Sequence, residues 1–227
     1  MKRVLVFAAH PDDEVLGCGA TIARHAANGD SVTIAIFAEG ITSRSDDPAD
    51  ANANELATLH GQAQEVADLL GAEELILLNF PDNRMDTVAH LDVIKRMEGL
   101  IERVQPHTLY IHHGGDLNVD HQVIFRAALT ATRPMEGGVV QEVLAFEVPS
   151  STEWAFQQLA PVFHPNVFVD VSETLDKKLA AMALYDGESR PFPHPRSPEA
   201  LRAIARRWGS TVGLHAAEAF QTIRSIR

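Results

Sequence analysis

The stretch that decides the fold lies near the start of the chain and reads Val4-Leu5-Val6-Phe7-Ala8-Ala9-His10-Pro11-Asp12-Asp13-Glu14-Val15-Leu16-Gly17-Cys18-Gly19. Its apolar beginning, Val4–Phe7, is typical of a buried strand. Ile22, Ala23 and Ala26 then follow with helical spacing, so the polar cluster lies on a turn from a strand to a helix. Ligands bind at the carboxyl ends of the strands in open parallel sheets. We therefore expect a functional site directly after the first strand.

The rest of the chain alternates apolar runs with helical patterns, which favours βαβ units and a parallel sheet. The expected strands are Val4–Phe7, Val32–Phe37, Leu75–Leu78, Leu109–His112, Val139–Glu147 and Val167–Val171. The expected helices are Gly17–Asn28, Asn52–Leu70, Leu91–Val104, His121–Thr132, Leu175–Tyr185 and one beginning near Pro198. We predict a single Rossmann-like α/β domain over residues 1–227. Its sheet is mostly parallel, with helices on both faces and the site at the C-terminal ends of the strands.

Composition argues against several classes of protein. The formal net charge is −12, whereas surfaces that bind nucleic acid are basic. No run approaches about 18 apolar residues, so we expect no membrane span. The apolar start is short and charges follow at once, so we expect no signal peptide. Cys18 is the one cysteine and has no internal partner for a disulfide, which suits a reducing cytoplasm.

The polar cluster itself favours a metal site. Gathering His10 beside Asp12, Asp13 and Glu14 is costly unless a cation or a substrate uses them. His10 and Asp13 lie three residues apart on a turn, so they can direct a nitrogen and a carboxylate oxygen at one point, as a zinc ion requires. Asp12 would lie beside the metal as a general base. The alternative is that the acids only cap the N-terminus of the helix.

The same residues resemble a known family. The string from Ala9 to Glu14, followed by Gly17-Cys18-Gly19, is similar to the signature of the PIG-L/LmbE-like de-N-acetylases, which are zinc hydrolases that remove acetyl groups from N-acetylglucosamine-type sugars. The resemblance implies zinc ligands at His10 and Asp13 and a general base at Asp12.

A second cluster is expected at the same edge of the sheet. It follows the fourth strand and reads His112-His113-Gly114-Gly115-Asp116-Leu117-Asn118-Val119-Asp120-His121. A catalytic zinc with three protein ligands keeps one position open, and His121 at the start of a helix is the best third ligand. The family resemblance implies the same ligand, because its third zinc ligand stands in such an Asp-His pair. Asp120 would then hydrogen-bond to a metal ligand and orient it without binding the metal, or it would cap the helix.

One position departs from the family pattern. Many members carry a histidine three residues before the third ligand, to which oxyanion stabilisation or protonation of the leaving amine is credited. This chain has Asn118 there, which donates a hydrogen bond but supplies no proton at neutral pH. Asp12 could return the proton that it takes from water, and Asp116, His113 and His194 are other candidates.

Three further residues are candidates for binding substrate. Glu39 ends the second strand, where family members carry an acid that reaches sugar hydroxyls; the alternative is a turn residue before Gly40. Arg84 follows the third strand in a segment resembling the family's Pro-Asp-x-Arg and offers a planar set of donors; it could instead pair with nearby acids. His194 stands in a proline-rich loop that either holds it over the site or forms a structural corner. The loop Glu39–Ala51 is expected to cover the site.

Together these features predict metal-assisted hydrolysis of an N-acetyl amino sugar that is free, nucleotide-linked or lipid-linked. One divalent ion, zinc or Fe(II), is the expected cofactor. Three alternatives stay open: an amidase for another acyl group or a thiol conjugate, a two-metal phosphoesterase, and a sugar-binding module that has lost catalysis. A homo-oligomer is compatible with the family.

Overall fold

The protein is built on one seven-stranded sheet with strand order β3-β2-β1-β4-β5-β7-β6. A computed structural model describes residues 1–40 and 53–227. Its strands are β1 (Arg3–Ala8), β2 (Ser31–Ala38), β3 (Glu74–Phe80), β4 (Thr108–His112), β5 (Glu142–Phe146), β6 (Val167–Asp170) and β7 (Ala217–Ser225). The pairs among β1 to β5 are parallel, whereas β7 runs antiparallel to both β5 and β6.

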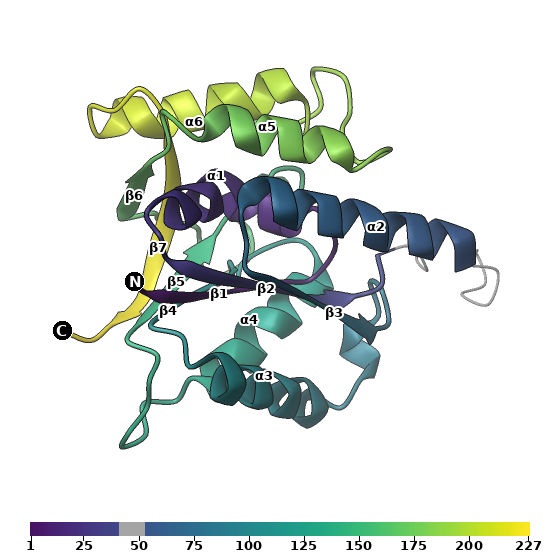
Figure 1. Cartoon of the computed structure of the whole chain (residues 1–227), viewed down its shortest axis with the longest axis vertical. Coiled ribbons are helices and arrows are strands. Elements are labelled where there is room, and N and C mark those ends of the chain that lie inside the picture. Colours follow the sequence, from purple (N-terminus) through teal and green to yellow (C-terminus); the bar gives the residue numbers. More distant parts are fainter. Residues whose placement is uncertain (41–52) are drawn as a thin grey trace.

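Helices cover both faces of the sheet (Figure 1). One layer holds α1 (Asp13–Ala27), α2 (Ala53–Leu70), α5 (Leu175–Leu184) and α6 (Pro198–Thr211), and the other holds α3 (His90–Val104) and α4 (Val119–Ala131). The described part of the chain also holds two short 3-10 turns in loops, η3 (Met85–Thr87) and η4 (Glu153–Ala155). Side chains alternate along β1, so Val4 and Val6 join the core under α1, while Leu5 and Phe7 join the core above α3 and α4.

The expected α/β architecture is confirmed, with three differences in its elements. The first helix begins at Asp13 rather than Gly17, because the acids of its first turn are buried in the site instead of facing solvent. The fifth strand is shorter than expected and spans Glu142–Phe146. Strand β7 was missed, because the buried Glu218 interrupts the apolar pattern that marks a buried strand. Among the described residues, no helix has the length and hydropathy to cross a bilayer.

Glu218 on β7 accepts hydrogen bonds from α1 where this helix is interrupted. The backbone of α1 leaves the helical conformation at Cys18, with φ −148° and ψ 21°. Glu218 accepts the backbone N–H groups of Ala20 (3.2 Å) and Thr21 (2.7 Å) just beyond this break. Lys178 of α5 lies 2.6 Å from Glu218 and donates to the Leu16 carbonyl. The buried ion pair therefore joins α1, α5 and β7.

Gly17, the residue directly before this break, lets α1 lie directly on the sheet. A Cβ atom at Gly17 would be 2.2 Å from the ring of Phe146 on β5, which is far closer than any van der Waals contact. A glycine here therefore sets the distance between the helix that carries the polar cluster and the strand beneath it.

The ion pair leads to a prediction about stability. Lys178→Met leaves the Glu218 carboxylate buried without its cation, and breaking such a pair costs about 3 kcal/mol or more. Urea unfolding should show this loss in the free energy of unfolding, whereas Lys177→Met, at the neighbouring exposed lysine, should change it by less than about 0.5 kcal/mol. Equal effects of the two substitutions would contradict this role for the pair.

Candidate metal centre

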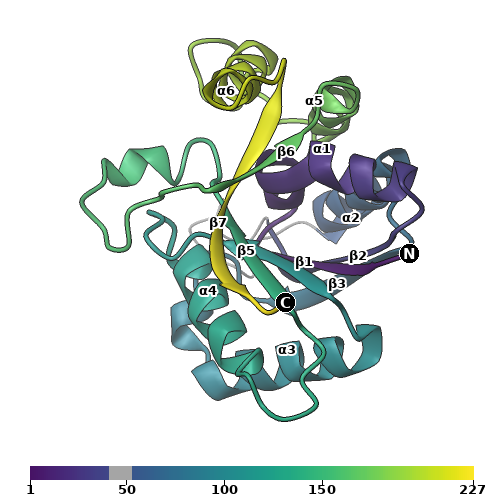
Figure 2. The same cartoon turned by 90° about the vertical axis from the view of Figure 1, so that its left-hand side faces the viewer.

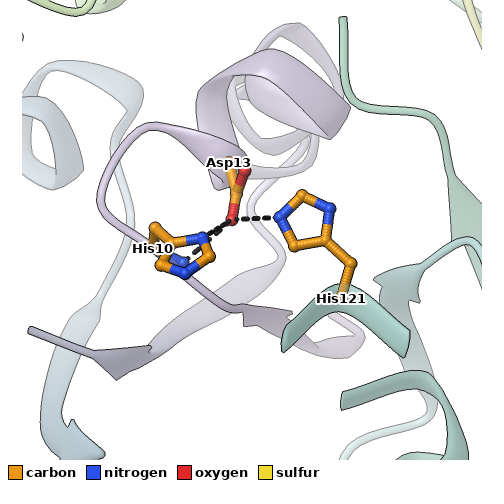
Figure 3. Close-up of side chains that lie close together, drawn as sticks. All are labelled: His10, Asp13 and His121. Carbon is orange, nitrogen blue, oxygen red and sulfur yellow. Dashed lines mark hydrogen bonds and ion pairs between the residues drawn. The ribbon is translucent and has the colours of Figure 1, made fainter. Parts of the chain in front are cut away.

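Three predicted metal ligands converge at the C-terminal edge of the sheet (Figure 3). His10 follows β1, Asp13 opens α1 and His121 lies in the first turn of α4. Asp13 Oδ2 is 3.2 Å from His10 Nδ1 and 3.1 Å from His121 Nε2. The backbone N–H of His10 also donates to Asp13 Oδ2 at 2.8 Å. Both imidazoles therefore present a nitrogen to one carboxylate oxygen.

The other nitrogen of each histidine faces a second carboxylate. His10 Nε2 is 3.0 Å from Asp120 Oδ2, and His121 Nδ1 is 3.1 Å from Asp116 Oδ1. Metal-bound histidines characteristically give their second nitrogen to a carboxylate, which fixes the orientation of the ring. The predicted supporting position of Asp120 fits this arrangement. The partnership of Asp116 with His121 was missed, since the sequence offered Asp116 only as a proton donor.

Both supporting carboxylates are held by neighbouring loops. Asp120 accepts the backbone N–H groups of Asn83 (2.7 Å) and Met85 (2.9 Å) in the loop after β3. Asp116 accepts from the hydroxyls of Ser151 and Thr152 in the loop after β5. Neither carboxylate is free to rotate away from its histidine.

His112 supports the centre from beneath. Its ring stacks on that of His121 with centroids 3.9 Å apart, and its Nε2 accepts the backbone N–H of Ala9 at 2.8 Å. Because burial lowers the pKa of His112 well below its usual value, this ring is neutral and accepts that bond. His112 thereby fixes both the end of β1 and the plane of the His121 ring.

The carboxylates set the charge of the histidines. Burial lowers the pKa of His121, but the charges of Asp13 and Asp116 outweigh burial and raise it to about 9. Burial also lowers the pKa of His10, but hydrogen bonds to Asp120 and Asp13 outweigh burial. The pKa of His10 therefore lies well above its usual value. The site thus attracts positive charge, and a metal ion would have to displace these protons.

The residues present fit a divalent metal. The ligand atoms of His10, Asp13 and His121 all lie within 4.8 Å of one another. Two imidazole nitrogens and one carboxylate oxygen form a donor set that suits zinc and also Fe(II). His10, Asp82 and Asp120 form a second possible group, but it shares His10 with the first, and Asp120 is already engaged by two backbone N–H groups.

The two predicted catalytic residues lie at the edge of this centre. Asp12 is almost fully buried and stands between the two ligands His10 and Asp13 in the chain. Asn118 caps α4, because its Oδ1 accepts the backbone N–H of Asp120 at 2.8 Å. Its Nδ2 donates to Asn83 Oδ1 at 2.8 Å.

A polar cleft of about 590 Å³ opens onto the centre. Its described lining comes from the first turns of α1 and α4 and from the loops after β1, β2, β3, β4, β5 and α5. It consists of His10, Pro11, Asp12, Asp13, Gly40, Asp82, Asn83, Asn118, His121, Ser150, Ser151, Glu188 and Arg196. Arg196, whose guanidinium lies 2.5 Å from Asp12, was missed by the sequence analysis. Its proline-rich segment had drawn attention only to His194.

The three residues predicted to bind substrate lie outside this described lining. Glu39 is half-buried at the end of β2, next to Gly40. Arg84 is exposed, and its carbonyl accepts a bond from the Thr87 hydroxyl. His194 packs edge-on against Trp154 with ring centroids 5.6 Å apart. Of the loop Glu39–Ala51 that is expected over the site, residues 41–51 lie outside the described part of the chain.

A buried centre of two histidines and one carboxylate, open to a cleft at the edge of a Rossmann-like sheet, is characteristic of metal-dependent hydrolases. Residues 5–132 match the family described as GlcNAc-PI de-N-acetylase, or PIG-L. The chain belongs to the PIG-L family of deacetylases.

Individual relatives cover most of the chain. The "Uncharacterized deacetylase YaiS" of Escherichia coli (strain K12) is 30% identical over 80% of this chain and 89% of its own length. The "Probable N-acetyl-alpha-D-glucosaminyl L-malate deacetylase 2" of Bacillus cereus is 27% identical over 83% of this chain and 84% of the relative. The crystal structure of GalB, the 4-carboxy-2-hydroxymuconate hydratase from Pseudomonas putida KT2440, has a TM-score of 0.77 at 24% identity, covering 98% of this chain and 96% of that one. Because that protein is named as a hydratase, the fold alone does not define the reaction.

The support of His121 by Asp116 can be tested by metal binding. Asp116→Asn removes the charge that faces His121 Nδ1, and loss of such a partner weakens metal affinity about 10- to 100-fold. A competition titration with a chromogenic zinc chelator measures this change. Glu147→Gln is the control, because Glu147 is a half-buried carboxyl that accepts a hydrogen bond from Trp208 and contacts no metal ligand among the described residues. Unchanged zinc affinity in Asp116→Asn would show that the contact does not support the metal.

Proposed function

We propose that this protein is a zinc-dependent N-deacetylase that hydrolyses the acetamide of an N-acetyl amino sugar. The observation that carries the proposal is the convergence of His10, Asp13 and His121 at the mouth of the cleft, with a carboxylate behind each histidine. Membership of a family described as a GlcNAc-PI de-N-acetylase supports N-acetylglucosamine-type substrates.

His10, Asp13 and His121 would hold the zinc, which supplies a Lewis acid that makes water nucleophilic near neutral pH. Asp12 takes a proton from the attacking water as the new bond to the acetamide carbon forms. Asp12 suits a base, because burial raises the pKa of its carboxyl well above the ordinary value, although Arg196 opposes the rise. When the C–N bond breaks, Asp12 returns this proton to the leaving amine, and the products are acetate and the free amino sugar.

Asn118 would serve the oxyanion rather than the leaving amine. Its Oδ1 accepts the Asp120 backbone N–H and one N–H of Nδ2 is given to Asn83, so the second N–H of Nδ2 is the donor that can face a ligand. An amide N–H donates a hydrogen bond to developing negative charge but gives up no proton. With Asn118 in this role, Asp12 acts both as the base toward water and as the acid toward the leaving amine.

The cleft favours an uncharged sugar. Among its described lining residues, four are acidic (Asp12, Asp13, Asp82 and Glu188), and Arg196 is the one arginine beside them. Arg196 is already paired with Asp12 and Glu188. A phosphate on the substrate would meet like charge here, so we expect free N-acetylhexosamines to be better substrates than nucleotide-linked ones.

Acetate release from a panel of free and nucleotide-linked N-acetylhexosamines tests this function. We expect release that depends on one bound zinc per chain, is lost on chelation and returns when zinc is restored. Asp12→Ala should lower kcat about 10²- to 10⁴-fold, the usual contribution of a general base. Asp86→Ala, at an exposed carboxyl in the loop after β3, should leave kcat unchanged.

Two outcomes would contradict the proposal. One is no acetate from any member of the panel by folded, zinc-loaded protein. The other is equal release by the wild type and Asp12→Ala, which would remove Asp12 as the base.

A further inference from the structure

Arg196 connects three loops around the cleft. It precedes α6, and its Nη1 is 2.5 Å from Asp12 Oδ2 and 2.8 Å from Glu188 Oε2. Its Nε donates to the hydroxyl of Ser150 at 2.8 Å. The side chain is 22% exposed, so the guanidinium lies in the wall of the cleft rather than in solvent. Asp12 belongs to the loop after β1, Ser150 to the loop after β5 and Glu188 to the loop after α5.

We propose that Arg196 is a positioning residue for Asp12, holding its carboxylate in the orientation that proton transfer requires. This inference rests on the proposed function, in which Asp12 is the base. A guanidinium is planar and donates in fixed directions. Because Ser150 anchors the Nε side and Glu188 shares the Nη1 side, the plane of the group is set before it meets Asp12.

The backbone of Asp12 adds to the need for such a contact. Asp12 has φ 113°, a conformation that residues with a side chain rarely adopt. Glu14 helps to hold it, since Glu14 Oε2 accepts the Asp12 N–H at 3.1 Å and Glu14 Oε1 accepts the Tyr185 hydroxyl at 2.6 Å. These bonds fix the backbone but leave the side-chain torsions of Asp12 free, and Arg196 is the partner that restrains them.

The charges of the site also require a cation at this place. Asp12 is 3% exposed and lies beside two further buried carboxyls, Asp13 and Glu14. A buried carboxylate without a partner is strongly destabilising, and like charges would turn Asp12 away from the metal ligands. Arg196 touches none of His10, Asp13 and His121 in the contacts of the described residues. Its removal should therefore disturb Asp12 without removing a metal ligand.

The test compares the zinc-loaded wild type with Arg196→Ala and Arg196→Lys in crystal structures and in acetate release. We expect zinc and its three ligands to stay in place in both variants, whereas the Asp12 carboxylate loses its single orientation in Arg196→Ala. We expect kcat to fall about 100-fold, the effect of a misplacement of about 1 Å, with KM within about twofold of the wild type. Arg196→Lys keeps the positive charge but lacks the planar guanidinium, so its kcat should lie between those of the wild type and Arg196→Ala. Arg190→Ala, at an exposed arginine in the same segment, is the matched control and should behave as the wild type.

Two results would overturn the inference. One is an Asp12 carboxylate that keeps its orientation in Arg196→Ala. The other is a rise in KM at unchanged kcat, which would make Arg196 a substrate-binding residue instead. The structural comparison needs no substrate, so a wild type that releases no acetate would refute the proposed function while the position of Asp12 still decides the role of Arg196.

Discussion

The site depends on one carboxylate oxygen, Asp13 Oδ2. The backbone N–H of His10 and one nitrogen of each of His10 and His121 lie within 3.2 Å of it, and a nitrogen of His112 lies at 3.6 Å. These groups come from the ends of two strands and the starts of two helices. A buried carboxylate tolerates this place because the His10 backbone N–H and the imidazoles of His10 and His121 can donate to it, whereas His112 Nε2 is an acceptor from Ala9 and only lies nearby. The same oxygen draws His10 and His121 into the geometry that a metal requires.

The topology of the sheet explains why these groups meet. The chain builds β1, β2 and β3 toward one edge of the sheet (Figure 2). It then returns to place β4 on the other side of β1. The crevice where the strand order reverses is the usual ligand site of such sheets. His10 follows β1 and His121 follows β4, so both ligands stand at this reversal. The loops after β3 and β5 flank it and supply the groups that hold Asp120 and Asp116.

The sequence predicted those features of the site that depend on residues close together in the chain. The turn after Val4–Phe7 is enough to bring His10 and Asp13 together. The alternation of strands and helices along the chain predicts that His121 lies at the same edge of the sheet. The contact of Arg196 with Asp12 and that of Glu218 with Ala20 could not be predicted in this way, because each joins residues more than 180 positions apart. In the sequence, Glu218 looks like a solvent-exposed acid near the C-terminus. Arg196 looks like an ordinary arginine in a proline-rich loop. Their roles follow from packing.

The central claim is that His10, Asp13 and His121 hold a single metal ion, and anomalous diffraction from crystals of the zinc-loaded protein tests it most directly. We expect one strong peak at the zinc absorption edge, within bonding distance of all three side chains. The claim would be contradicted by no peak at this place, or by two peaks about 3.5–4 Å apart, the separation found in two-metal sites such as those of phosphatases.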